Sequence, residues 1–150
     1  MGRRFVTLAG LTRLSGISRG TLEDWLRRGL FPAVTLPGSA RKSFSTQTLI
    51  ACVVARRLMD IGLDGEPVWR VVRFLSRADL DQRVEAGQRW LLLTRQQCFL
   101  CNEESRLERV SGVGPHAFVI VDLDAVRKAL PSEEEPQVQV EQVEELEVVA

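Results

Sequence analysis

Hydrophobic positions near the start of the chain recur at helical spacing. Leu8, Leu11 and Leu14 lie three residues apart, so they share one stripe of a short helix. Thr7 precedes the stripe and is a suitable N-cap. Ser15-Gly16 then ends the segment, because glycine is a poor helix former. The pattern predicts a helix over residues 7–14.

A second helix is predicted to begin at Ser18, whose hydroxyl can cap it. Leu22, Trp25 and Leu26 follow at the spacing of one helical face, and Gly29 is placed to end the helix. Two short helices joined by a tight turn that contains glycine form a helix-turn-helix.

The next segment predicts a hairpin and two more helices. Extended residues on both sides of Pro37-Gly38 predict a β-hairpin whose second arm carries Arg41 and Lys42. Ser45 is expected to cap a helix that runs to about Asp60. The inward positions expected on it are Leu49, Val53, Leu58 and Ile61. Gly62 ends this helix, and the next one begins near Pro67, with Val68, Val71, Val72 and Leu75 as its apolar face.

Beyond residue 79 the apolar runs shorten to strand length. They lie at residues 90–93, 98–100 and 117–121, with a loop expected over 111–115. Asp122 or Asp124 is expected to cap a short helix through Leu130. The fold class is therefore α+β: a helix-turn-helix domain with a wing (1–78), then a small, mostly antiparallel sheet with one helix (79–131). Residues 132–150 hold almost only Glu, Gln and Val and are expected to be disordered.

Charge is segregated along the 150 residues, although the total is zero. Residues 1–80 hold 13 Lys or Arg against 6 Asp or Glu, a net of +7, whereas residues 131–150 hold 7 Glu and no base. A basic region attracts polyanions whatever the rest of the chain carries. The acidic end is therefore expected to compete with DNA for the basic region.

Linked sequence pieces in the first 75 residues resemble the MerR-type winged helix-turn-helix family. They are Ser15-Gly16-Ile17-Ser18 as the turn, Thr21-Leu22-x-x-Trp25 in the second helix, Gly29-Leu30-Phe31-Pro32 as its exit, and Lys42-Ser43-Phe44-Ser45 in the wing. The resemblance implies a regulator of transcription that binds double-stranded DNA as a homodimer. It covers about half of the chain, and the C-terminal half resembles no family that we can name.

The second helix and the wing are the expected DNA contacts. The leading end of such a helix enters the major groove, and its free N–H groups favour phosphate. The wing cations are placed to bind phosphate or to reach the minor groove. The candidate DNA-binding residues are Ser18, Arg19, Thr21, Arg27, Arg28, Arg41 and Lys42. Trp25 and Phe44 lie on apolar stripes and are expected in the core.

Two other functions use a fold of this kind. Glu23 and Asp24 stand on the second helix, where an acid either reads a cytosine amino group or repels phosphate. Repulsion would favour a protein-binding adaptor or modulator. A phage or mobile-element protein that shapes DNA, such as an excisionase or a small terminase subunit, is the other alternative. The C-terminal sheet is expected to mediate self-association or to bind a partner.

The remaining chemistry in the sequence is sparse. Cys98 and Cys101 could hold a metal, but residues three apart on a strand face opposite sides, so buried thiols are the preferred interpretation. His116 has no evident catalytic partner, and the sequence contains no Gly-rich phosphate-binding loop. We therefore expect that the protein is not an enzyme and binds no cofactor. No apolar run is long enough to cross a membrane, and the odd cysteine count favours a reducing compartment. We therefore expect a cytoplasmic, nucleoid-associated protein.

Overall fold

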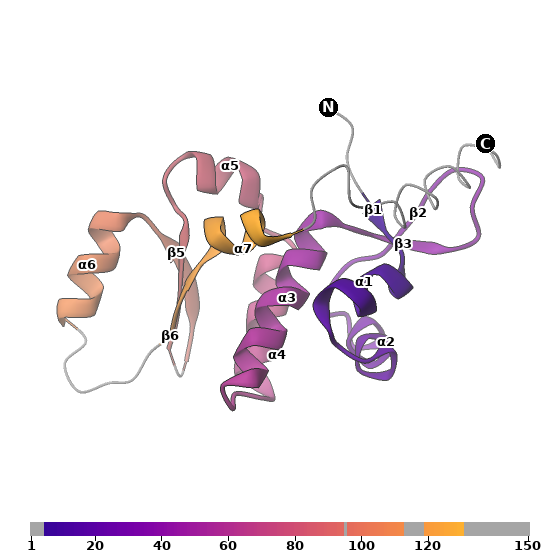
Figure 1. The fold of residues 1–150 in the computed structure, drawn as a ribbon, viewed down its shortest axis with the longest axis horizontal. Coiled ribbons are helices and arrows are strands. Elements are labelled where there is room, and N and C mark those ends of the chain that lie inside the picture. Colours follow the sequence, from indigo (N-terminus) through magenta and orange to yellow (C-terminus); the bar gives the residue numbers. More distant parts are fainter. Residues whose placement is uncertain (1–4, 95, 113–118, 131–150) are drawn as a thin grey trace.

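A computed structural model describes residues 5–94, 96–112 and 119–130 of the chain. The described part is α+β, with helices and two small antiparallel sheets, as the sequence predicts. The helices α3 and α4 separate the two sheets, and Figure 1 shows the N-terminal elements at one end of the molecule and the C-terminal sheet at the other. The expectations for His116 and for disorder over residues 132–150 concern positions outside this described part.

The first two helices are close to the predicted ones. Helix α1 spans Leu8–Ser15 and is capped by Thr7, whose Oγ1 accepts a hydrogen bond from the N–H of Gly10 at 3.1 Å. Helix α2 spans Arg19–Arg27 and is capped by Ser18. Both glycine stops are confirmed, because Gly16 and Gly29 adopt the left-handed conformation, with φ of 82° and 77°.

A three-stranded sheet packs beside these helices. Its strands are β1 (Phe5–Val6), β2 (Val34–Thr35) and β3 (Lys42–Ser45), in the order β1-β3-β2 with antiparallel pairing. The β2–β3 hairpin confirms the prediction. Strand β1 was not predicted, because two residues carry no periodicity and this strand exists only through its pairing with β3.

The long helix α3 (Thr46–Asp60) and the helix α4 (Glu66–Leu75) form the middle of the molecule. Their predicted inward residues are buried, with one exception. Ile61 was expected to face the core, but its side chain is 65% exposed. The reason is that α3 ends at Asp60: Ile61 is the C-cap residue, with φ −96° and ψ 10°, and lies outside the helical stripe.

The C-terminal part adds a second sheet and three helices. The strands β4 (Trp90–Leu93), β5 (Cys98–Cys101) and β6 (Val119–Asp122) lie in the order β5-β4-β6, and both pairings are antiparallel. Helix α5 spans Leu80–Glu85, α6 spans Glu103–Gly112 and α7 spans Leu123–Ala129. Asp122 rather than Asp124 caps α7.

The expectation of a loop over 111–115 is wrong at its start. Ser111 and Gly112 belong to α6, and residues 113–115 lie outside the described ranges. Residues 103–112 are strongly polar and carry no clear apolar stripe, so no helix was predicted there. Acidic residues in the first turn, Glu103 and Glu104, favour the start of this helix through its dipole.

One hydrophobic core runs through the described part. Leu91 and Leu93 of β4 join the cluster that also contains the buried faces of α1 to α4, and Leu123 of α7 belongs to it as well. Trp25 and Phe44 are buried in this core, as predicted. The N-terminal helices therefore rest on the same packed interior as the C-terminal sheet.

Candidate nucleic-acid interface

Helix α2 begins at an exposed end. The Oγ of Ser18 accepts a hydrogen bond from the N–H of Thr21 at 3.2 Å, and the Ser18 hydroxyl donates to Thr21 Oγ1 at 2.9 Å. Arg19 and Gly20 are exposed, and the first turn contains no acidic residue. The first N–H groups of a helix have no acceptor within it, and their partial positive charge favours an anion.

Gly20 leaves open space at this end. A Cβ added there would meet no heavy atom within 4 Å. An exposed glycine in the first helical turn therefore allows the backbone of another molecule to approach α2 closely.

The inner face of α2 fixes which side chains are presented. Leu22 and Trp25 are buried, with 0% and 4% exposure, whereas Arg27 and Arg28 at the trailing end are exposed. The arginines therefore lie on the solvent side because the apolar stripe faces the core.

The two arginines of α2, and Arg28 at its C-cap, are paired with acids of this helix. Arg19 Nε lies 3.3 Å from Glu23 Oε2. Arg27 Nη2 and Arg28 Nε each lie 2.9 Å from one oxygen of the Asp24 carboxylate. The hydrogen bond from Arg27 is the main cause that lowers the pKa of Asp24, and the charge of Arg28 lowers it further. Asp24 is therefore ionised at neutral pH and competes with any external anion for these arginines.

The β2–β3 hairpin presents two further cations. Arg41 and Lys42 are exposed, and no ion-pair partner for Lys42 occurs among the described residues. The strand that carries Lys42 is held by Phe44, which is buried and packs edge-to-face on Phe31 with ring centroids 5.5 Å apart. Figure 1 shows this hairpin at the same end of the molecule as α1 and α2.

Two arginines from the supporting helices bind the backbone at the two ends of α2. Arg56 of α3 donates from Nη1 to the carbonyl oxygen of Gly16, in the turn before α2, at 2.9 Å. Arg77, just after α4, donates to the carbonyls of Leu30 at 2.9 Å and Gly29 at 3.0 Å, in the exit from α2. These bonds fix α2 on the core. Sequence reasoning missed both, because the partners are 40 or more positions apart.

A stacking contact adds to this support at the trailing end. The guanidinium of Arg28 lies over the ring of Trp69 on α4, 4.8 Å from the ring centroid. A cation at this distance is attracted by the face of an indole ring. Arg28 therefore contacts both Asp24 and Trp69, while its side chain stays 50% exposed.

The cysteine pair lies on strand β5, as predicted. Cys101 is buried and Cys98 is partly buried. Burial raises the pKa of the Cys98 thiol, and it raises that of Cys52 in α3 to about 12. Within residues 5–94, 96–112 and 119–130, no group of three or more His, Cys, Asp or Glu residues is arranged to hold a metal ion. The Cys52 and Cys98 thiols are therefore protonated at neutral pH.

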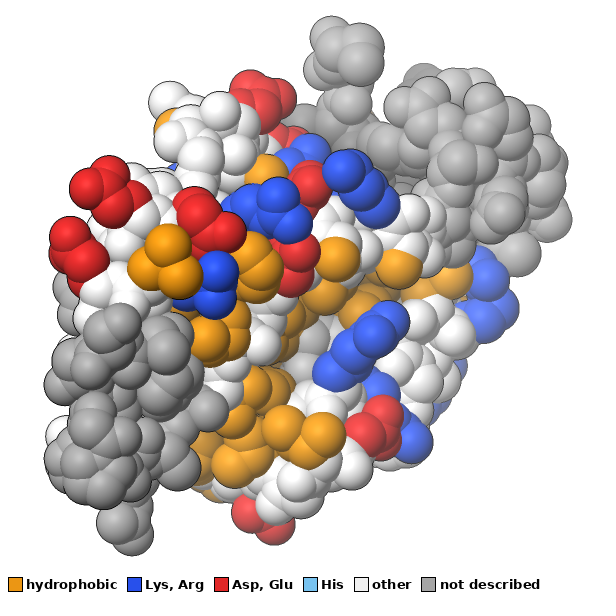
Figure 2. Space-filling model, turned by 60° about the vertical axis from the view of Figure 1, so that its left-hand side comes forward, with side chains coloured by type: hydrophobic (Ala, Val, Ile, Leu, Met, Phe, Trp, Pro, Cys, Tyr) orange, Lys and Arg blue, Asp and Glu red, His pale blue; other side chains and the backbone are white. Residues whose placement is uncertain are grey.

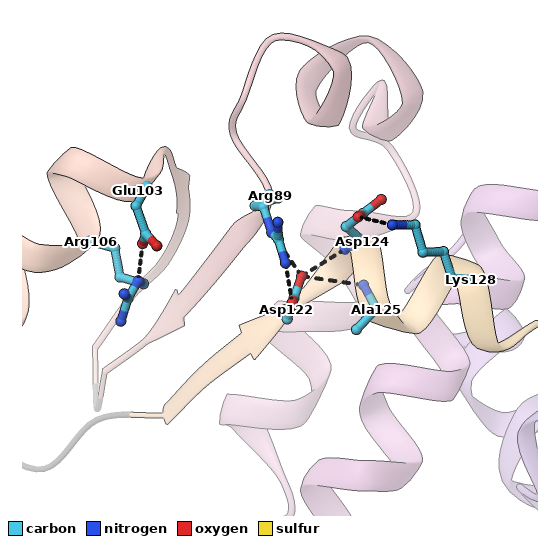
Figure 3. Close-up of polar contacts among 7 residues, drawn as sticks. All are labelled: Arg89, Glu103, Arg106, Asp122, Asp124, Ala125 and Lys128. Atoms are coloured by element: carbon cyan, nitrogen blue, oxygen red, sulfur yellow. Dashed lines mark hydrogen bonds and ion pairs between the residues drawn. The ribbon is translucent and has the colours of Figure 1, made fainter.

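A polar site lies at the end of the C-terminal sheet (Figure 3). Arg89 forms two hydrogen bonds with the Asp122 carboxylate, one of them from Nε at 3.1 Å. The same carboxylate caps α7 by accepting from the N–H groups of Asp124 and Ala125. The hydrogen bond from Arg89 is the main cause that lowers the pKa of Asp122. This network links Arg89, just before β4, to the junction of β6 and α7 and has a structural role.

Comparison of the sequence with known protein families gives no match, and comparison with curated proteins gives none either. No helix in the described part of the chain combines the length and the apolar character that crossing a bilayer requires.

Proposed function

We propose that this protein is a sequence-specific DNA-binding protein, a MerR-like transcription regulator with a winged helix-turn-helix domain. The observation that carries the proposal is the exposed, capped leading end of α2, which lies at the same end of the molecule as the cationic hairpin. Such an end fits the major groove, and cations on a hairpin fit the flanking phosphates. A protein with this function would work at the nucleoid in the cytoplasm.

The roles of the individual residues follow from their positions. Ser18, Arg19 and Thr21 would meet the base edges and phosphates at the leading end. Arg27 and Arg28 would contact the DNA backbone at the trailing end. Both are paired with Asp24, so their ion pairs with Asp24 would be replaced by contacts with phosphate. The hairpin cations would add phosphate or minor-groove contacts.

We also propose that the protein acts as a homodimer, because a helix-turn-helix protein reads two half-sites that are one helical turn apart. The C-terminal half is the candidate contact surface. Figure 2, in which the left-hand side of Figure 1 is turned forward, shows hydrophobic side chains gathered across the middle of the visible face. Leu107 of α6 is 54% exposed and is one apolar side chain that a second copy could cover.

Selection of bound sequences from random duplex DNA tests the proposed function directly. We expect an enriched sequence with two-fold symmetry and an affinity that falls steeply with salt. The double variant Arg19→Ala/Lys42→Ala should lose most of this binding. The matched control Arg83→Ala/Lys128→Ala removes two exposed cations from the C-terminal half and should bind normally. If the two double variants bind equally, the proposed interface is wrong.

The adaptor function is the second candidate, since Glu23 and Asp24 neutralise most of the charge on α2. If α2 binds a protein, the full chain should show no retention on duplex DNA at low salt. Replacing Arg19 should then weaken capture of one defined protein. Retention on duplex DNA that depends on Arg19 favours the regulator.

A further inference from the structure

A groove lies between the end of α1 and the second half of α3. Its volume is about 480 Å³, and its apolar lining is provided by Leu14, Val53 and Ile61. Ile61 is one of the three large hydrophobic side chains that are exposed in the described part, the others being Val34 and Leu107. An exposed isoleucine beside a groove is an unused apolar surface that a partner could cover.

The polar rim of the groove holds two arginines and one aspartate, Asp60, so its net charge is +1. Arg56 is bound to Asp60 at 3.0 Å and to the carbonyl of Gly16, so its charge is largely used. Arg57 is exposed and has no ion-pair partner among residues 5–94, 96–112 and 119–130. The groove therefore fits a segment that alternates apolar and acidic side chains.

The chain itself contains such a segment directly after the described part. Residues 131–150 carry 7 Glu and no Lys, Arg or His, interleaved with valines and one leucine. Leu130, where the described part ends, packs against the core, and α7 contacts α3. Helix α3 has 15 residues and is therefore about 22 Å long. The 20 following residues can span up to about 66 Å, which is enough to reach any point along α3.

We propose that residues 131–150 dock in the groove between α1 and α3, with valines on Leu14, Val53 and Ile61 and glutamates facing Arg57. The effect of this docking on DNA binding rests on the proposed function, whereas the docking itself does not. The groove borders the turn at Gly16 that leads into α2. A docked acidic segment would lie near the leading end of α2 and repel phosphate there.

Photo-crosslinking of the full chain tests the docking without DNA. A benzophenone amino acid replaces Ile61, which is 65% exposed, in one variant. In two control variants it replaces the other exposed apolar side chains, Val34 (38%) or Leu107 (54%). We expect a crosslink from position 61 to residues 131–150 and little from the other two positions. A mixture of ¹⁴N- and ¹⁵N-labelled protein shows whether the crosslink joins one chain to itself.

The outcomes separate the docking from its alternatives. A crosslink to the acidic segment from position 34 would place the segment on the hairpin, and one from position 107 would place it beside the C-terminal sheet. Either result, or a crosslink between two chains only, overturns the proposal. Adding Arg57→Glu should lower the yield from position 61 roughly fivefold, as expected when a nearby ion pair becomes a repulsion. An unchanged yield also contradicts it.

Duplex DNA then tests whether the docked segment and DNA compete. If the proposed function holds, saturating duplex should lower the yield from position 61, because DNA and the acidic segment exclude one another. An unchanged yield with DNA bound would retain the docking and refute the competition. Crosslinking in a protein that binds no DNA would retain the docking and refute the proposed function.

Discussion

Replacing Asp24 by Asn should strengthen the binding of DNA of any sequence. The Asp24 carboxylate holds Arg27 and Arg28 at 2.9 Å each. Asparagine keeps the shape of this side chain but removes its charge, so both guanidinium groups become available to phosphate. The side chains of Asp24, Arg27 and Arg28 are 37%, 74% and 50% exposed, so the substitution leaves the core packing unchanged.

The magnitude follows from counterion release. Each additional phosphate contact steepens the plot of log affinity against log salt by about 0.9. Two freed arginines should therefore steepen it by about 1 to 2 and raise the affinity roughly threefold to tenfold at about 50 mM salt. The effect should fade at high salt, where exposed charges are screened.

Fluorescence anisotropy with a random-sequence duplex, over a series of salt concentrations, measures both quantities. Asp124→Asn is the matched control, because Asp124 pairs with Lys128 at 3.0 Å in the same manner on α7, far from α2 in Figure 1. It changes the net charge equally and should leave DNA binding unchanged. Equal behaviour of the two variants would refute a specific role of Asp24 on α2.

Three other substitutions have defined outcomes. Gly20→Ala should raise the midpoint of thermal unfolding by about 1 to 2 °C, because alanine is the better helix former. It should also weaken DNA binding, because the added methyl group obstructs close approach to α2. Equal DNA affinity of the variant and the wild type would contradict this obstruction. Arg77→Ala should lower the free energy of unfolding by about 1 to 2 kcal/mol in urea titrations through loss of its bonds to backbone carbonyls, whereas Arg83→Ala should have little effect. Asp122→Asn should lower the free energy of unfolding by about 0.5 kcal/mol at pH 7. Because the folded-state pKa of Asp122 is lowered from the ordinary value of 3.8, this stabilisation is complete above that value and is lost as the pH falls through the folded pKa. A deficit that stays constant as the pH is lowered through the acid range would contradict this.

Local signals predicted the elements that depend on local physics. Helix α2 follows from the Ser18 cap, the stripe of Leu22 and Trp25 and the stop at Gly29, all within about a dozen residues. The C-terminal sheet follows from three short apolar runs. These patterns encode which face is buried, and burial decides the structure in each case.

Elements that depend on distant partners could not be predicted in this way. Strand β1 forms because Phe5 pairs with Ser45, and neither residue signals the other. Arg56 and Arg77 resemble surface cations in the sequence, yet both bind carbonyls in distant segments. The pairing of Asp24 with two arginines was open to prediction, because acid and base three or four positions apart on a helix are neighbours.

The arginine contacts at the two ends of α2 have a consequence for divergence. Arg56 and Arg77 donate hydrogen bonds to main-chain oxygens, which every residue type supplies. These bonds therefore do not depend on which side chains α2 carries. Outward positions of α2 can therefore be exchanged without rebuilding what holds the helix. The exposed surface of α2 can therefore change in sequence, by evolution or by design, while the helix keeps its position on the core.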